Sequence, residues 1–170
     1  MKVTDSGIPV GTLITAVKQA VRQSGMSQSS QGPQDLQVAS VRLVLRALAS
    51  KSAGGSLDFR VPFIGMKIHT GAKVTRNDTQ RITITLVPPS KSGRTVRGDV
   101  EQTLVDAITT IRQTMAEAAT GGDPWVLSDS VIDIDFGITR TGSISIGADG
   151  ELSGEVTQTL SVTLKSPAQP

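Results

Sequence analysis

The chain has 170 residues, no cysteine and a formal net charge of +2, a length that suits one domain or two small units sharing a core. Without cysteine it has no disulfide framework, thiol nucleophile or thiolate metal site, and its apolar runs are too short for a membrane-spanning helix. Aromatic residues are scarce, so the core must be aliphatic, and the absence of a secretory signal predicts a cytoplasmic protein.

The first half of the chain predicts a helix followed by three strands. In the stretch TLITAVKQAV from Thr12, the apolar residues Leu13, Val17 and Val21 recur at helical spacing, and Pro9 suits an early turn of that helix. Apolar and polar residues then alternate, as they do in strands with one buried face. These segments are residues 41–47, 57–63 and 82–86.

The second half predicts the same order of elements. The stretch TLVDAITTIR from Thr103 places Leu104, Ile108 and Ile111 on one helical face. Three alternating segments follow, at residues 132–138, 144–146 and 160–164. The halves correspond at an offset of 91 positions in the helix and first strand, and of 78 positions in the third strand.

This repetition predicts an α+β fold of two tandem αβββ units, with an antiparallel sheet and two packed helices. One unit of about eighty residues is near the lower limit for a firm core, so two copies that pack together would stabilise each other. The predicted units span residues 1–89 and 99–170, and a basic linker, residues 90–98, joins them. Short Gly-containing connections favour an antiparallel meander within each unit.

Three stretches of the first half carry a resemblance to a known family: GIPVGTLITAVKQAV, LQVASVRLVLRAL and TQRITITLVPP. They resemble the trypsin-co-occurring domain of bacterial conflict systems and its relative, the Pepco domain. The second half, from VEQTLVDAITTIR to QTLSVTLKSP, resembles the same unit more loosely. The resemblance implies a small accessory or adaptor module that acts beside proteases or signalling effectors in bacterial antiviral defence. It implies no particular site residues.

The charge of the chain is divided between its halves. Residues 1–89 carry eleven basic and four acidic residues, whereas residues 99–170 carry three basic and eleven acidic residues. Opposite patches steer encounters and fix the register of a complex. They could attract each other within one chain, join copies head to tail in a homo-oligomer, or bind a charged bacterial effector or protease; they could also be merely solvated. The candidate interaction surface comprises Arg42, Arg46, Arg60, Lys67, Asp129, Asp133 and Asp135.

No catalytic, cofactor or metal site is expected, so we expect a non-enzymatic interaction module. His69, the single histidine, lies in a segment that predicts an exposed loop or strand edge. Asp133 and Asp135 fall on the polar side of an alternating strand, which favours a solvated face over a cation site. Nucleic-acid binding is not expected, because aromatic residues for base stacking are nearly absent.

A membrane role remains open as the alternative function. The alternating, Gly-rich segments that follow Leu57 and Gly142 would suit an effector that oligomerises into a membrane pore. The scarcity of aromatic residues argues against it, since membrane barrels carry aromatic girdles at both interfaces.

Overall fold

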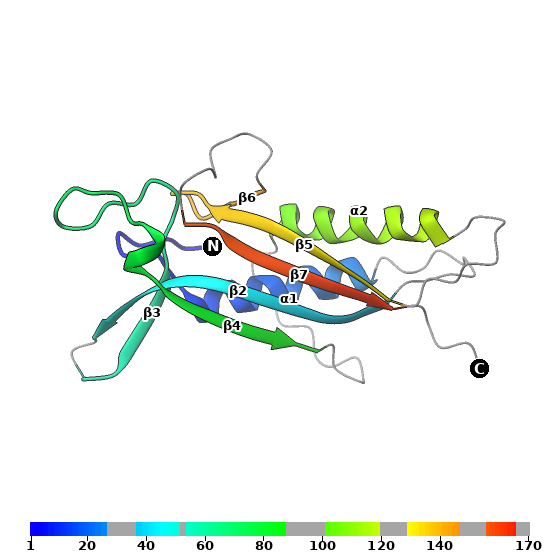
Figure 1. Ribbon diagram of the computed structural model, residues 1–170, viewed down its shortest axis with the longest axis horizontal. Coiled ribbons are helices and arrows are strands. Elements are labelled where there is room, and N and C mark those ends of the chain that lie inside the picture. The colour runs from blue at the N-terminus through cyan, green and yellow to red at the C-terminus, as the bar shows by residue number, and fades with distance from the viewer. Residues whose placement is uncertain (27–36, 52–53, 88–100, 120–128, 147–155, 166–170) are drawn as a thin grey trace.

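The computed structural model describes residues 1–26, 37–51, 54–87, 101–119, 129–146 and 156–165. Within them the chain forms two α-helices and an antiparallel sheet, which confirms the predicted α+β class and the packing of two helices on that sheet (Figure 1). The basic linker predicted at residues 90–98 lies outside the described residues, and the division into units stays a prediction.

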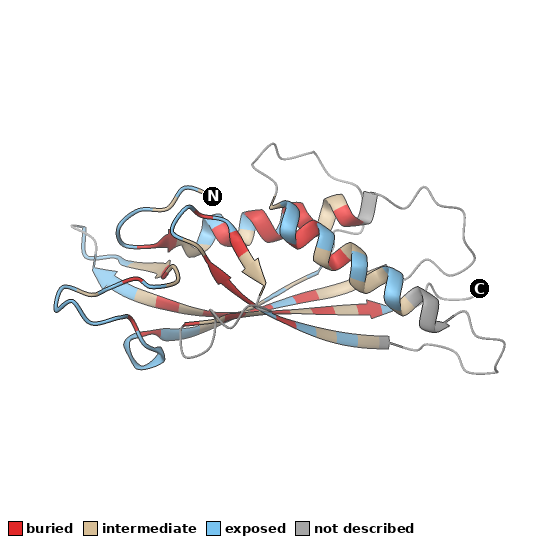
Figure 2. Cartoon of the chain, turned by 90° about the horizontal axis from the view of Figure 1, so that it is seen from above, coloured by how far each residue is buried: buried red, intermediate tan, exposed pale blue. Residues whose placement is uncertain are grey.

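Both helices lie on the same face of the sheet (Figure 2). The helix α1 (Val10–Met26) and the helix α2 (Gln102–Ala119) each bury one apolar stripe, and Leu13 and Leu104 are fully buried in one common cluster. Pro9 does not lie in the first helical turn as predicted. It ends the short strand β1 (Ile8–Pro9) and pairs with Arg60, so the helix begins one residue later.

The other strands are longer than, or close to, the segments that alternation predicted. Every strand pair is antiparallel. The strands are β2 (Gln37–Lys51), β3 (Leu57–Val61), β4 (Gln80–Leu86), β5 (Asp129–Ile138), β6 (Ile144–Ile146) and β7 (Gln158–Lys165), and a short 3₁₀ helix, η1 (Arg76–Asp78), precedes β4.

The order of the strands differs from the predicted meander. The strand β2 pairs with β3 through residues 48–51 and with β4 through residues 41–47, and β3 and β4 do not pair with each other. In the second half β5 pairs with both β6 and β7. The first strand of each half is therefore central. A long connection, residues 62–79, separates β3 from β4, which pair with different parts of β2.

A single sheet joins the two halves, because β7 lies between β2 and β5. The order across the main part of the sheet is thus β4, β2, β7, β5. Leu43 pairs with Leu160 and Val41 with Val162, and all four side chains are buried beneath the helices. Because these buried pairs join a strand of the first half to a strand of the second, the two halves share one hydrophobic core. Burial of each such side chain contributes roughly 1.5–3 kcal/mol to the stability of that core.

Candidate interaction surface

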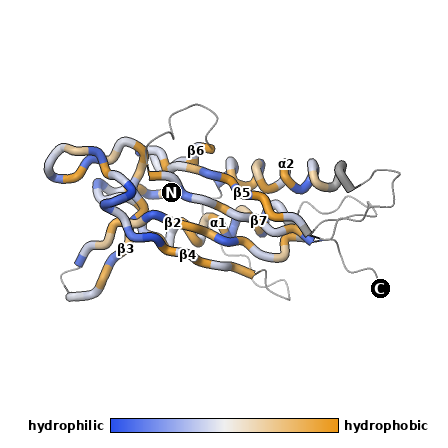
Figure 3. The backbone as a smooth tube through the Cα atoms, viewed as in Figure 1, coloured by the Kyte–Doolittle hydropathy of each residue, from blue (hydrophilic) through white to orange (hydrophobic). Residues whose placement is uncertain are grey.

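The face of the sheet opposite the helices carries polar and charged side chains. Along β2, β4, β5 and β7 the more buried residues alternate with more exposed ones, and Figure 3 shows hydrophobic and hydrophilic residues following each other along these strands. We call this surface the open face. Its residues are Arg42, Val44 and Arg46 on β2, Arg81, Thr83 and Thr85 on β4, Thr159, Ser161 and Thr163 on β7, and Val131, Asp133 and Asp135 on β5.

The charge on the open face changes sign across the sheet. In one row of paired residues, Arg42 on β2 lies beside Ser161 on β7, which lies beside Asp133 on β5. Two strand spacings, about 10 Å, therefore separate the backbones that carry the arginine and the aspartate. The basic side of the face is formed by β4 and β2, the acidic side by β5, and hydroxyl groups on β7 lie between them.

The charged side chains on the two sides of the open face have different local surroundings. The hydroxyl of Thr159 donates a hydrogen bond to Oδ1 of Asp135 at 2.7 Å, which fixes this carboxylate above β7. On the basic side Arg46 is paired directly with Arg81 on the neighbouring strand. Like charges opposite each other in a sheet are unfavourable, so this side of the face favours contact with an acidic group.

Five of the seven residues of the predicted interaction surface lie on β2 and β5. Arg42, Arg46, Asp133 and Asp135 have side chains on the open face, and Asp129 is the first residue of β5, paired with Lys165. Arg60 on β3 and Lys67 in the loop that follows β3 lie together at another place, and the interaction surface as a whole stays a prediction.

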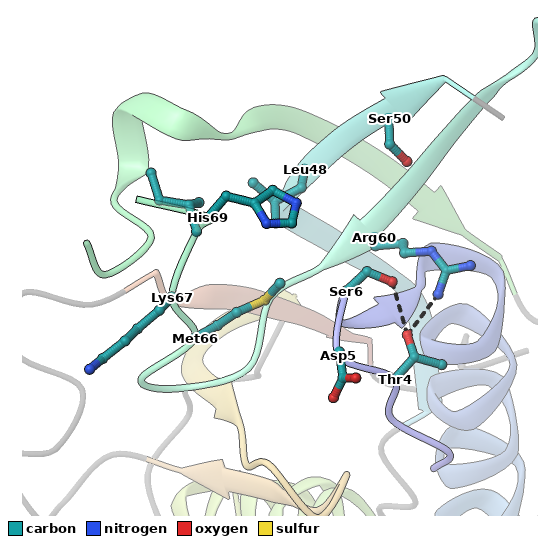
Figure 4. Close-up of a pocket in the computed structure, with 10 residues that line it drawn as sticks. Thr4, Asp5, Ser6, Leu48, Ser50, Arg60, Met66, Lys67 and His69 are labelled. Carbon is teal, nitrogen blue, oxygen red and sulfur yellow. Dashed lines mark hydrogen bonds between the residues drawn. The ribbon is translucent and has the colours of Figure 1, made fainter. Parts of the chain in front are cut away.

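Arg60 and Lys67 line a separate depression of about 710 Å³ near the N-terminus (Figure 4). Nε of Arg60 lies 2.7 Å from Oδ2 of Asp58, and Nη1 donates a hydrogen bond to the Thr4 hydroxyl at 2.9 Å. These contacts tie the N-terminal segment to β3. The guanidinium group therefore has a structural role here, and its charge is already partly compensated.

The same depression contains His69 together with Asp5 and Ser6. His69 is exposed in a turn, as its sequence context predicted. The Ser6 hydroxyl is hydrogen-bonded to that of Thr4 at 3.0 Å, and among the described residues no hydrogen bond connects His69 with Ser6 or Asp5. A nucleophile needs a base within hydrogen-bond reach, so these side chains do not form a nucleophile–base pair in this conformation.

The structure also reveals surface residues that the sequence alone did not single out. Val131 on β5 is 61% exposed, and Val87, directly after β4, is 72% exposed. Along residues 129–135, β5 has one strand partner within the described residues, β7. The strand β4, which carries Arg81 and leads to Val87, likewise has one there, β2. Alternation marks Arg81 and Val131 as residues of the polar face, but only strand order shows that they lie at the edges of the sheet.

Among the described residues, no group of three or more His, Asp or Glu side chains is placed to hold a metal ion. Neither of the two helices has the length and apolar character that crossing a membrane requires, again within the described part of the chain.

Residues 8–88 match the family model described as trypsin-co-occurring domain 2. The matched segment contains α1, β2, β3 and β4, which confirms for the first half the resemblance that its sequence indicated. No curated protein and no solved structure matches the chain.

Proposed function

We propose that this chain, whose residues 8–88 match trypsin-co-occurring domain 2, is a non-enzymatic adaptor of a bacterial defence or signalling system. In this proposal the chain associates with itself through its oppositely charged halves and acts in the cytoplasm beside a protease or another effector. The observation that carries the proposal is the division of charge across the open face, with Arg42 and Arg46 on one side and Asp133 and Asp135 on the other.

The two halves are, in this proposal, tandem copies of one αβββ unit. A helix and three strands follow each other twice, and in each half the first strand pairs with both of the others. Leu13 and Leu104, 91 positions apart, both lie fully buried in the shared cluster. A duplicated unit whose copies carry opposite net charge supplies both partners of an electrostatic contact in one chain.

The geometry favours head-to-tail association over contact between identical surfaces. Acidic and basic residues lie on opposite sides of the open face, so two copies that meet through the same edge of the sheet would bring like charges together. A copy displaced along the sheet instead brings its basic side to the acidic side of the first. Such a heterologous contact forms a ring if it closes and a filament if it does not.

Light scattering at low and high salt tests self-association. We expect assemblies at low ionic strength that dissociate as salt rises, because the Debye length falls from about 30 Å at 0.01 M to about 3 Å at 1 M. The double variant D133N/D135N should weaken the assembly on the order of tenfold, since exposed ion pairs contribute up to about 1 kcal/mol each.

Lys67→Gln is the matched control, because it removes an exposed charge that lies off the sheet. It should leave the assembly unchanged. A chain that stays monomeric at every salt concentration would overturn the proposal. Release of dye from liposomes at high protein concentration would point instead to the membrane pore that the sequence left open.

A further inference from the structure

The contact between β2 and β7, which joins the two halves, has a defined register. Val44 pairs with Thr159, Arg42 with Ser161 and Ser40 with Thr163. Residues 41–44 pair at the same time with β4. The strands β4 and β7 therefore lie on opposite edges of β2, and β7 occupies the edge that faces away from the β4 of the first half.

The two segments that form this contact, one on β2 and one on β7, each have a counterpart on an outer strand of the sheet. Residues 38–44 of β2 correspond to residues 129–135 of β5 at the offset of 91, and residues 159–164 of β7 correspond to residues 81–86 of β4 at the offset of 78. Phe136 pairs with both β6 and β7, so β6 lies on the β5 edge that faces away from β7.

Along residues 129–135 no strand in the described part of the chain pairs with that edge of β5. The outer edge of β4 likewise has no strand partner within the described ranges, since β4 pairs there with β2 alone. An exposed edge strand is a template for pairing with another chain. The molecule thus presents a copy of each component of its own internal contact, at opposite ends of one sheet.

We infer that the outer edge of β5 in one copy pairs antiparallel with the outer edge of β4 in the next copy, in the register of the internal contact. Applied to the outer strands, the two offsets place Asp135 opposite Arg81, Asp133 opposite Thr83 and Val131 opposite Thr85. This inference rests on the self-association proposed above and names the strands and the register that produce it.

The backbone alternation agrees with this register. The N–H of Arg46 is directed toward the β7 side of β2, where Oε1 of Gln158 accepts its hydrogen bond at 2.6 Å. Even-numbered residues of β2 therefore direct their backbone groups toward β7 and odd-numbered ones toward β4. The pairings of β2 with β4 and of β7 with β5 extend this alternation to the two outer strands. On those strands the backbone N–H and C=O groups that are directed away from the sheet belong to residues 131, 133 and 135 of β5 and residues 81, 83 and 85 of β4. These are the residues that the proposed register pairs.

The side chains along the two edges are complementary in charge and in polarity. The Asp135 carboxylate would lie opposite the Arg81 guanidinium, which within one copy lies opposite another arginine. Val87 would lie diagonally across from Val131, so that two of the large apolar side chains most exposed to solvent would contact each other. On the helix side, Ile84 would pair with Ile132, and both are only partly buried in a single copy.

The absence of cysteine makes disulfide cross-linking a direct test. Directly paired residues in an antiparallel sheet have Cα atoms about 4.5–5.5 Å apart, within the range for a disulfide, whereas a shift of two residues places them about 9 Å apart. A V131C chain should therefore cross-link to a T85C chain but not to a T83C chain. A D133C chain should show the reverse preference. Thr83 and Thr85 are matched, since both are exposed on the same face of β4.

We expect each correctly paired mixture to give at least fivefold more covalent dimer on a non-reducing gel than its mismatched partner. Equal yields in matched and mismatched mixtures would overturn the register. Efficient cross-linking of T85C chains with one another would also overturn it, because that product requires two β4 edges to meet. Light scattering of the wild-type protein separates this inference from the proposed self-association. If the wild type assembles but no register-specific cross-links form, only the pairing of β5 with β4 is refuted. If the wild type is a monomer at every salt concentration, both proposals are refuted.

A charge exchange gives a second, independent readout. The single variants R81D and D135R each place like charges opposite each other in the proposed contact, so each should weaken assembly at low salt on the order of tenfold. The double variant R81D/D135R restores the pair with its signs exchanged and should recover most of the lost affinity. If the loss of assembly free energy in the double variant equals the sum of the losses in the two single variants, the pairing of Asp135 with Arg81 is contradicted.

Discussion

The Gln158 side chain accepts a hydrogen bond from the backbone N–H of Arg46 across 112 positions of sequence, with the two atoms 2.6 Å apart. Gln158 is fully buried, although glutamine is usually exposed. It is the first residue of β7 and lies next to the part of β2, beyond Val44, that does not pair with β7. The side chain thus supplies the acceptor that a strand partner would otherwise provide, and it ties the second half of the chain to the first.

Replacing Gln158 by Ala should therefore lower the free energy of unfolding by about 1–3 kcal/mol, because it leaves the partly buried backbone N–H of Arg46 without its acceptor. Chemical denaturation followed by circular dichroism measures this change. Gln80→Ala is the control, since Gln80 is exposed at the start of β4 and should shift the free energy by less than about 0.5 kcal/mol. Equal effects of the two substitutions would show that the buried hydrogen bond contributes little.

The shared core predicts that the two halves unfold together. Leu104 on α2 is fully buried in the cluster that also contains Leu13 on α1, so Leu104→Ala should cost about 2–5 kcal/mol. Because both helices lie over one sheet, calorimetry should show one transition for the wild type and one for the variant, at a lower temperature. Thr103→Ala, at an exposed neighbouring position, serves as the control. Two transitions, with only one shifted by Leu104→Ala, would contradict a shared core.

Gly7 has a backbone conformation and a location that exclude any side chain. Its φ is +96°, and a Cβ atom there would overlap the carbonyl oxygen of Val61 on β3. Gly71 has a φ of +81° but open space around it, so Gly71→Ala should cost only the backbone strain of about 1–2 kcal/mol. Gly7→Ala should cost about 1–3 kcal/mol more, since β1 and β3 must separate to admit the methyl group. Thermal unfolding of the two variants measures the difference, and equal melting temperatures would show that the N-terminal segment does not depend on this close contact.

Asp78 at the end of η1 predicts a local dependence on pH. The backbone N–H of Thr75, 2.8 Å from Oδ2, and then the Thr75 hydroxyl, 2.7 Å from the same atom, lower the pKa of Asp78 below its ordinary value of 3.8. A lowered pKa means that the ionised carboxylate stabilises the folded turn above pH 3.8, and that this contribution is lost as the pH falls through the lower folded-state pKa.

An NMR titration of the Asp78 carboxyl carbon checks this expectation. Its midpoint should lie below the ordinary value in the wild type, and Thr75→Val, which removes the hydroxyl donor but keeps the backbone N–H, should raise it part of the way back. A wild-type midpoint at the ordinary value would contradict the hydrogen-bonded turn. The effect on global stability should be small, because the carboxylate is exposed.

The amino-acid sequence by itself determined both helices and the six longer strands, though not the short strand β1, and it determined which face of each is buried. Leu13 and Val17, four positions apart, mark one side of a helix, and the alternation of Ile82 and Ile84 with threonine marks one side of a strand. This information is local, because the periodicity of side-chain direction depends only on the backbone geometry of a single element. It also sufficed to place Asp133 and Asp135 on the polar side of β5.

Only the tertiary structure decided which strands are neighbours. The alternation in β2 is equally compatible with the predicted meander and with the observed position between β4 and β7, because either arrangement buries the same face. Strand neighbours are fixed by packing among segments far apart in the sequence, and so is the position of an edge. For this reason the sequence grouped Arg60 with Arg42 although Arg60 lines the depression near the N-terminus, and it did not show that Arg81 and Val131 lie on strands with an unpaired edge.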